Sequence, residues 1–329
     1  MTSALGALAH RVLAGGALER SEAAALLSLP DEDLPALLHA AFRIRERTWG
    51  RRVKICMLRN ARSGLCPEDC HYCSQSAISD AAIPRYRLDS VPELLAGARR
   101  AVASGARRYC MVTSGRGPSA ADVARFTAAA RAIKAAFPQL ELCVSLGLMG
   151  EETAHELKAA GIGWVNHNLN TSRRFYPEIC TTHSYDERIA TMRAVRRAGL
   201  ATCCGGIIGM GEAPEDVIDL AFALRDLKVD SLPVNFLHPI DGTPLAQQRR
   251  LTPGYCLRAL CLFRFTNPEC ELRVAGGREL KLGWFQSLAL YPANSIFVDG
   301  YLTTPGQASA EARRMVLGMG FEVESVTEQ

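Results

Sequence analysis

The sequence predicts an α/β chain folded as a (β/α)8 barrel of the TIM type, preceded by an N-terminal helical extension. After the first 50 residues, short β-rich runs alternate with longer amphipathic runs, and this pattern continues to the end of the chain. Eight β-rich runs are present, and eight strand-helix units favour a closed barrel with its active site at the C-terminal ends of the strands. A doubly wound open sheet would also alternate strands and helices, and it is the alternative fold.

The individual elements follow from the same pattern. Strands are expected at 53–58, 107–113, 140–146, 164–169, 201–209, 231–237, 271–276 and 295–300. The helices between them have serine start signals and glycine stop signals, at Ser90, Ser119 and Ser184 and at Gly105, Gly161 and Gly199. The last two helices are expected at 281–290 and 306–318. Because no linker divides the repeat, we expect helices over 1–50, one barrel domain over 51–322 and a tail over 323–329.

Composition narrows the class of protein. Among 329 residues, 48% are hydrophobic and 22% are charged, which is typical of a globular chain. The formal net charge is only +4, without a polybasic stripe, so we expect a small-molecule enzyme and no nucleic-acid partner. No apolar run is long enough to span a membrane, and charged residues interrupt the start of the chain, so the expected location is the cytoplasm. The 12 cysteines then point to thiol, metal or redox chemistry.

The segment "CPEDCHYCSQS" follows the first expected strand and holds Cys66, Cys70 and Cys73. Thiolates are soft ligands for zinc or iron-sulfur clusters, and this spacing lets one short loop turn three sulfurs inward. A structural zinc would need a fourth ligand, and His71 is a poor candidate because it is adjacent to Cys70. Unrelated buried thiols are another reading. The remaining interpretation is a [4Fe-4S] cluster held by three cysteines, with the fourth iron open to a ligand that is not protein.

A second group of residues lies within later expected strands. Cys110, Cys143 and Cys203 fall on three strands whose alternate residues face the barrel interior, so their thiols can converge. Each cysteine alone could be ordinary core packing. Arg273 lies on a fourth strand among apolar residues, and a buried guanidinium needs an anionic partner. That partner is either a carboxylate such as Glu279 or a second iron-sulfur cluster held by the three thiols.

The three-cysteine loop resembles the signature of the radical S-adenosylmethionine (SAM) enzymes, including an aromatic residue, Tyr72, before the last cysteine. Much more of the chain, from about residue 50 to residue 322, resembles the biotin synthase family. The matching segments are "YCMVTSGRG", "WVNHNLNTS", "CTTHSYDERIATM", "CCGGIIGMGE", "PVNFLHPIDGTPL", "LRVAGGRE" and "ANSIFVDGYLTTPG".

The resemblance implies a sulfurtransferase that inserts sulfur between C6 and C9 of dethiobiotin to give biotin, the last step of biotin biosynthesis. Two SAM molecules would be used per product, each giving a 5′-deoxyadenosyl radical at the [4Fe-4S] cluster. A [2Fe-2S] cluster held by Cys110, Cys143, Cys203 and Arg273 would donate the sulfur and be consumed. The resemblance also implies a homodimer, an electron donor such as flavodoxin or ferredoxin, and iron-sulfur assembly machinery as partners.

The resemblance assigns further site residues. The cosubstrate would meet Tyr72, Asn168 and Asn170, and its methionine carboxylate would pair with Arg188. The ureido ring of dethiobiotin would bind Asn166 and Asn168, and the carboxylate end of the substrate would lie near Asn235, Thr303 and Thr304. Without the resemblance, an Asn-rich strand end is often a set of caps and turns, and a helical arginine is often a solvated charge. We expect His167 to support the site indirectly.

The remaining cysteines are sorted by strand parity and position. Cys56 on the first strand should face the interior near the second cluster, which leaves the number of irons in that cluster open or provides a spare thiol. Cys204 should point to the opposite face from its neighbour Cys203. The other four are expected to be packing residues on helices and loops: Cys180, Cys256, Cys261 and Cys270.

Two rival functions are compatible with the residues. One is a related barrel enzyme that uses the first cluster for a radical rearrangement without donating sulfur. The other is a binding or structural protein in which the three loop cysteines hold a static metal. The first rival predicts no functional second cluster, and the second predicts no cleavage of SAM.

Overall fold

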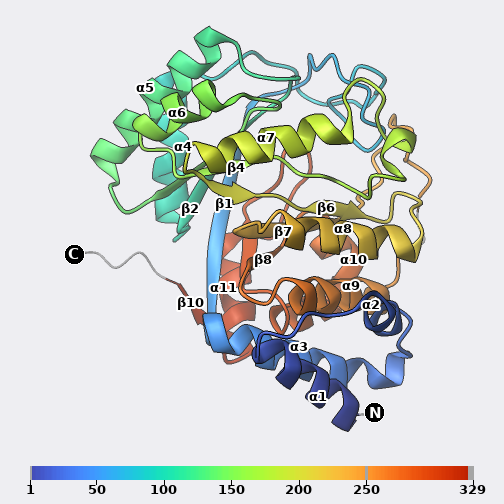
Figure 1. Ribbon diagram of the computed structural model, residues 1–329. Coiled ribbons are helices and arrows are strands. Elements are labelled where there is room, and N and C mark those ends of the chain that lie inside the picture. The colour runs from blue at the N-terminus through green and yellow to red at the C-terminus, as the bar shows by residue number, and fades with distance from the viewer. Residues whose placement is uncertain (1, 249–250, 325–329) are drawn as a thin grey trace.

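The computed structural model describes residues 2–248 and 251–324, and it folds as a closed parallel barrel surrounded by helices (Figure 1). The strands are β1 (Arg52–Arg62), β2 (Arg108–Thr113), β3 (Glu141–Ser145), β4 (Trp164–Asn166), β5 (Ala201–Cys203), β6 (Gly206–Ile208), β7 (Ser231–Phe236), β8 (Glu271–Val274), β9 (Ser295–Val298) and β10 (Glu322–Val323). Pairing of β1 with both β2 and β9 closes the sheet. The predicted (β/α)8 fold is therefore confirmed, and the open-sheet alternative is excluded.

The fifth position of the barrel is divided between two short strands, although the sequence suggested a single run over 201–209. β5 pairs with β7 only through Cys203 and Ser231, and β6 resumes the pairing at Gly206 and Val234. Between these two paired residues of β7 lies Pro233, which has no N–H to donate to the sheet. Gly205 lies between the two strands, where a Cβ would come within 1.9 Å of the Pro233 carbonyl oxygen. The break therefore follows from the proline and the close approach of the two chains.

Helices cover the outside of the barrel. They are α4 (Val91–Ala103), α5 (Ala120–Ala136), α6 (Glu151–Ala159), α7 (Tyr185–Arg197), α8 (Pro214–Asp226), α9 (Pro253–Thr266), α10 (Arg278–Leu282) and α11 (Ser309–Gly318), with 3-10 turns η2 (Tyr176–Glu178) and η3 (Gly283–Leu290). The predicted serine starts are N-caps with capping boxes: Ser90 with Glu93, Ser119 with Asp122 and Ser184 with Glu187. No helix of the described chain is long and apolar enough to cross a membrane.

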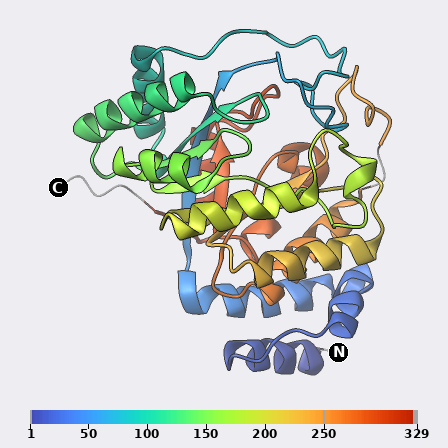
Figure 2. The ribbon, with the colours of Figure 1, turned by 45° about the horizontal axis from the view of Figure 1, so that its top comes forward.

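The N-terminal extension consists of α1 (Thr2–Leu13), α2 (Arg20–Leu27), the turn η1 (Asp31–Asp33) and α3 (Leu34–Trp49). These helices pack on one another and on α8 and α9. Both ribbon views place them at the end of the molecule opposite the loop that follows β1 (Figures 1 and 2). The short strand β10 pairs with the beginning of β1 at that same end, which the sequence did not predict. Part of the expected tail, 325–329, lies outside the described residues.

The barrel interior contains its own small apolar cluster, separate from the main core between sheet and helices. Its buried members come from five strands or strand ends: Cys56, Cys110, Cys143, Ala275 and Phe297. Cys56, which faces inward, contacts Ser295 Oγ at 3.6 Å. The inward direction expected for Cys56 is thus observed. Cys204 packs in the main core instead, on the face opposite Cys203.

Below this cluster, a buried carboxylate joins three strands. Glu271 at the start of β8 is 1% exposed and accepts hydrogen bonds from Nη1 and Nη2 of Arg108, at 2.9 and 3.0 Å. Its carboxylate also meets Lys54 Nζ at 3.2 Å and pairs with Arg273. Burial alone would raise the pKa of Glu271, but the three cations hold it well below its usual range. The carboxylate is therefore ionised and fixes the three cations in place.

We expect Glu271→Gln to lower the free energy of unfolding by about 3 to 5 kcal/mol, because it leaves buried cations without their shared anion. Urea denaturation of the cluster-free chain, followed by far-ultraviolet circular dichroism, measures this change. The matched control is Glu156→Gln on the exposed face of α6, which should change stability by less than about 0.5 kcal/mol. Equal effects of the two substitutions would show that the buried network contributes nothing.

Candidate active site

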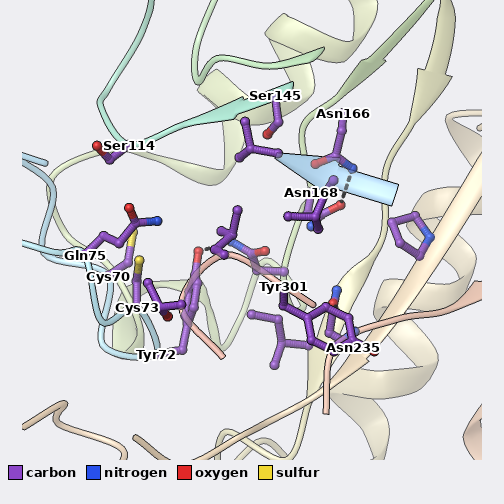
Figure 3. Close-up of a pocket in the computed structure, with 18 of the residues that line it drawn as sticks. Cys70, Tyr72, Cys73, Gln75, Ser114, Ser145, Asn166, Asn168, Asn235 and Tyr301 are labelled. Carbon is purple, nitrogen blue, oxygen red and sulfur yellow. Dashed lines mark hydrogen bonds between the residues drawn. The ribbon is translucent and has the colours of Figure 1, made fainter. Parts of the chain in front are cut away.

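A cavity of about 370 Å³ opens at the C-terminal ends of the barrel strands. Every side chain that the sequence assigned to the site lines it: Cys66, Cys70, Tyr72, Cys73, Cys110, Cys143, Asn166, Asn168, Asn170, Arg188, Cys203, Asn235, Arg273, Thr303 and Thr304. Figure 3 shows Cys70 and Cys73 on one side of this cavity, with Asn166 and Asn168 facing them from the other. The fold thus brings together residues separated by more than two hundred positions.

The three-cysteine loop is held by the segment that precedes α7. Asp69 accepts hydrogen bonds from the backbone N–H groups of Thr181 and Thr182, at 2.9 and 3.2 Å, and from the Cys180 thiol at 3.1 Å. The His71 N–H donates to the Ile179 carbonyl oxygen at 2.9 Å. Hydrogen bonds from the Thr181 hydroxyl, the two N–H groups and the Cys180 thiol keep the pKa of Asp69 well below its usual value, although burial alone would raise it. The loop is therefore ordered by the protein itself.

The spacing of the loop sulfurs fits a cluster better than a single ion. Among the described residues, the one group of three or more Cys, His, Asp or Glu ligand atoms lying within 4.8 Å of one another is Cys70, Cys180 and His183. The sulfurs of Cys66, Cys70 and Cys73 are thus spread more widely than one metal ion requires. All three sulfurs still face one cavity, as thiolates that bind separate irons of a [4Fe-4S] cluster must. His71 is not among the residues that line the cavity.

Arg188 is buried against the cluster loop and is not a solvated surface charge. It is 7% exposed and donates to the Asn168 carbonyl oxygen at 2.8 Å, to the Tyr176 hydroxyl, and to His183 Nε2 at 3.1 Å. Within the described chain, no carboxylate lies at ion-pair distance from its guanidinium. The barrel therefore presents a buried positive charge to the cavity without a protein counter-ion, which suits an anionic ligand.

The asparagines after β4 form an ordered pair. Asn166 Nδ2 donates to Asn168 Oδ1 at 3.0 Å and to Cys203 Sγ at 3.3 Å, and the Gly205 N–H donates to the same Asn168 oxygen at 3.1 Å. In the described chain, Asn166 Oδ1 and Asn168 Nδ2 have no hydrogen-bond partner. The pair therefore offers one free acceptor and one free donor group to a ligand in the cavity.

Asn170 and Asn235 connect the cavity wall to the loop that contains β6. Asn170 adopts a left-handed backbone conformation, with φ of 71°, and its Nδ2 donates to the Tyr72 hydroxyl at 2.5 Å. Asn235 donates to the Gly206 carbonyl oxygen at 3.1 Å and accepts from the Gly276 N–H at 3.0 Å. Its amide is thus largely used by the backbone, although one N–H and one lone pair of Oδ1 are left.

The other expected substrate contacts lie at the mouth of the cavity or beside it. Thr303 shares a 2.8 Å hydrogen bond with Ser74 of the cluster loop, and Thr304 follows it along the wall.

His167 is buried, its Nε2 has no hydrogen-bond partner in the described chain, and burial holds its pKa well below the usual value. His167 therefore presents a neutral, unpartnered nitrogen in the cavity wall.

The three strand thiols meet at the deep end of the cavity. Cys110 and Cys143 are register partners on β2 and β3, and the Cys143 thiol interacts electrostatically with the thiols of Cys110 and Cys203. Arg273 Nη1 donates to Cys203 Sγ at 3.8 Å. The interaction with Cys143 lowers the pKa of Cys203 to about 5, and the guanidinium groups of Arg273 and Arg108 act in the same direction. The group can therefore present thiolate sulfur beside a guanidinium.

Arg273 has a protein partner, but it is Glu271, not Glu279. Glu279 instead pairs with Arg278 and accepts from the Tyr301 hydroxyl. The network around Glu271 also retains excess positive charge. Its four cations are Lys54, Arg107, Arg108 and Arg273, and its three carboxylates are Glu141, Glu271 and Glu324. An anionic cluster on the three thiols fits that surplus.

Sequence reasoning missed several residues of the site. Lys54, Arg108 and Glu271 lie two positions before Cys56, Cys110 and Arg273, so strand parity already placed them on the inward face. Cys180 was expected to be a packing residue, but its sulfur lies 3.7 Å from Cys70 Sγ, and His183 lies beside both. The hydrogen bond from Cys70 lowers the pKa of Cys180 to about 4. No local pattern indicates this contact, since it joins residues 110 positions apart.

Comparison with solved structures supports the class of fold. Methylornithine synthase (PylB) superposes with a TM-score of 0.85 at 21% identity, covering 96% of this chain and 97% of that one. The FeFe-hydrogenase maturase HydG from Carboxydothermus hydrogenoformans gives 0.81 at 16% identity, covering 99% and 80%. The Radical SAM superfamily profile matches residues 62–224. Fold, profile and three-cysteine cavity together define a radical SAM enzyme.

The particular family follows from the remaining matches. The profile of the Biotin and Thiamin Synthesis associated domain matches residues 233–322. The chain is 51% identical over 321 residues to biotin synthase from Bacillus subtilis, covering 98% of this chain and 96% of that protein. It is 50% identical to biotin synthase from Geobacillus kaustophilus, covering 96% and 95%. The chain belongs to the biotin synthase family.

We expect Asp69→Ala to loosen the contact between the cluster loop and residues 180–183, because it removes the acceptor of the Thr181 and Thr182 N–H groups. Hydrogen-deuterium exchange of the cluster-free chain should show amide exchange in 180–183 accelerated about tenfold. The control is Asp80→Ala, an exposed aspartate on the same loop. Unchanged exchange in Asp69→Ala would show that this carboxylate does not hold the segment.

Proposed function

We propose that this protein catalyses the radical insertion of sulfur between C6 and C9 of dethiobiotin to give biotin. One observation carries the proposal beyond family membership: a single cavity holds two separate sets of three cysteines. Cys66, Cys70 and Cys73 line one side, and Cys110, Cys143 and Cys203 line the deep end with Arg273. A radical rearrangement would need only the first set, whereas sulfur insertion needs both.

The two sets divide the chemistry between them. When bound, a [4Fe-4S] cluster with SAM supplies a deoxyadenosyl radical, and a second cluster supplies the sulfur. Cys66, Cys70 and Cys73 would hold the first cluster, while Cys110, Cys143, Cys203 and Arg273 would hold the second. Apolar side chains of the wall, such as Val112, Ile207 and Phe297, exclude water from the space between them. This exclusion protects a reactive radical from side reactions.

The substrate assignments rest on the free hydrogen-bonding groups. A ureido ring has N–H donors and a carbonyl acceptor, which match the unpartnered Asn166 Oδ1 and Asn168 Nδ2. Arg188 would receive the methionine carboxylate of SAM, and Tyr72, Asn168 and Asn170 would contact the rest of the cosubstrate. We assign the carboxylate end of dethiobiotin to three residues of the outer wall: Asn235, Thr303 and Thr304.

We propose that the second cluster is [2Fe-2S]. Three cavity thiols and one arginine provide four ligands, the number needed by two tetrahedral irons bridged by two sulfides. Cys56 faces the interior and packs with Cys110 and Cys143, yet it is not among the residues that line the cavity. Burial raises the pKa of Cys56 to about 11, so it remains a protonated thiol below the cluster.

The cellular setting is inferred from the same chemistry. Twelve free cysteines suit a reducing compartment, and we propose that the enzyme acts in the cytoplasm. It would receive single electrons from a flavodoxin or ferredoxin and have its second cluster rebuilt by iron-sulfur assembly machinery.

We propose a homodimer in which residues 51–322 act as one catalytic domain and 1–50 as its helical extension. The exposed apolar side chains of Leu280, Trp284 and Phe285 offer a surface for association.

The decisive experiment is an anaerobic single-turnover assay of the reconstituted protein with dethiobiotin, SAM and a chemical reductant, followed by mass spectrometry. Biotin together with 5′-deoxyadenosine is the expected result. Deoxyadenosine without any sulfur-containing product would favour a radical rearrangement enzyme. Absence of SAM cleavage by a protein that retains its iron would favour a static metal site.

Single substitutions should separate the two cysteine sets. Cys70→Ala is expected to abolish deoxyadenosine formation, because the first cluster loses a ligand. Cys143→Ala should remove most biotin formation while leaving some SAM cleavage, because only the deep set is damaged. Iron and sulfide analysis after reconstitution should show a deficit in each variant, and Cys261→Ala, a buried thiol of α9, is the control. Normal biotin yield from Cys143→Ala would refute the placement of the second cluster.

A further inference from the structure

Cys180 and His183 lie against the first cysteine set but have no role in the proposed reaction. Cys180 Sγ lies 3.7 Å from Cys70 Sγ. His183 Nε2 lies 3.7 Å from Cys70 Sγ and 3.6 Å from Cys180 Sγ. All three side chains are buried, and their ligand atoms lie within 4.8 Å of one another. The arrangement is therefore compact on the scale of one metal ion.

These three distances are close to the edge lengths of a tetrahedral zinc site. Cys180 Sγ also lies 3.3 Å from His183 Nδ1, so the imidazole must turn for Nε2 to point at the ion. With Zn–S bonds of about 2.3 Å and Zn–N bonds of about 2.0 to 2.1 Å, tetrahedral geometry places two sulfurs about 3.8 Å apart and a sulfur and a nitrogen about 3.6 Å apart. The observed separations of 3.7, 3.7 and 3.6 Å lie within about 0.2 Å of these values. Cys180 and His183 are also only three positions apart, a short spacing that lets neighbouring ligands turn toward one ion.

Charged groups around the site come within one charge of balancing a divalent cation. Glu68 is buried and its Oε2 lies 3.6 Å from His183 Nε2. Arg188 donates to the same nitrogen at 3.1 Å, and a cation on Nε2 would replace this hydrogen bond, because the nitrogen has one lone pair. Arg116 bridges Glu68 and Glu187, at 3.4 and 2.7 Å. Asp69 also accepts from Cys180 Sγ at 3.1 Å. Two thiolates and three carboxylates then carry five negative charges, and the cation and two arginines carry four positive charges. Glu68 or a water molecule is available for the fourth coordination position.

We propose that the chain, when it carries no iron-sulfur cluster, binds one thiophilic divalent cation such as Zn²⁺ through Cys70 Sγ, Cys180 Sγ and His183 Nε2. The site differs from a zinc site on the three-cysteine loop, since it uses only one sulfur of that loop. If Cys70 also holds the first cluster, as the proposed function requires, the cation and the cluster exclude each other. Zinc would then compete with assembly of the radical centre.

The test titrates the reduced, cluster-free, full-length chain with Co²⁺ alone and then displaces the cobalt with Zn²⁺. We expect one equivalent to give the visible bands of four-coordinate cobalt and the charge-transfer bands of thiolate coordination. Cys180→Ser and His183→Gln should each weaken binding at least tenfold. The matched variants Cys66→Ser and Cys73→Ser should bind as the wild type does, and circular dichroism verifies that each variant is folded.

Two results would overturn the metal site: no stoichiometric cobalt binding by the wild type, or binding that is lost in Cys66→Ser and retained in Cys180→Ser. A second measurement addresses the competition. Preloaded zinc should slow reconstitution of the first cluster with iron and sulfide in the wild type but not in Cys180→Ser. If cobalt binds as expected but zinc leaves reconstitution unchanged, the metal site stands and the assignment of Cys70 to the first cluster fails.

Discussion

The buried carboxylate of Glu271 is the interaction on which the interior of the barrel depends. It lies where β1, β2 and β8 begin, and it holds Lys54, Arg108 and Arg273 at hydrogen-bond or ion-pair distance. Desolvation would make any one of these cations costly by itself. The shared carboxylate offsets the desolvation cost of the three cations, and a surplus of positive charge remains next to the cavity. The charges at the closed end of the barrel thus favour an anionic group at the deep end of the cavity.

The cavity above this network is organised by depth. One thiol set belongs to a loop at the open end, and the other set belongs to the strands themselves. Asn166 links the two levels, because its amide reaches Cys203 below and Asn168 beside it. A ligand bound to the asparagine pair would lie between the two thiol sets, which the proposed function assigns to the radical and to the sulfur. Rigid strands set this separation, which loops alone would hold less well.

Cys70 occupies a special position in this arrangement, since its sulfur belongs to the cluster loop and also contacts Cys180 and His183. The hydrogen bonds that Asp69 accepts from residues 180–182 hold the cluster loop against the segment before α7. If Cys70 binds both the proposed cation and the first cluster, the metal that binds first decides whether the cluster can assemble.

The sequence by itself determined the closed (β/α)8 fold, the inward direction of Cys56, Cys110, Cys143 and Cys203, and the loop of three cysteines. Hydrophobic period and strand parity are local properties, so they could be predicted without coordinates. Only the tertiary structure decided that Arg273 pairs with Glu271 rather than Glu279, that Arg188 is buried, and that Cys180 lies against Cys70. These contacts join distant segments, and their geometry depends on how loops and strand ends pack, which no local pattern specifies.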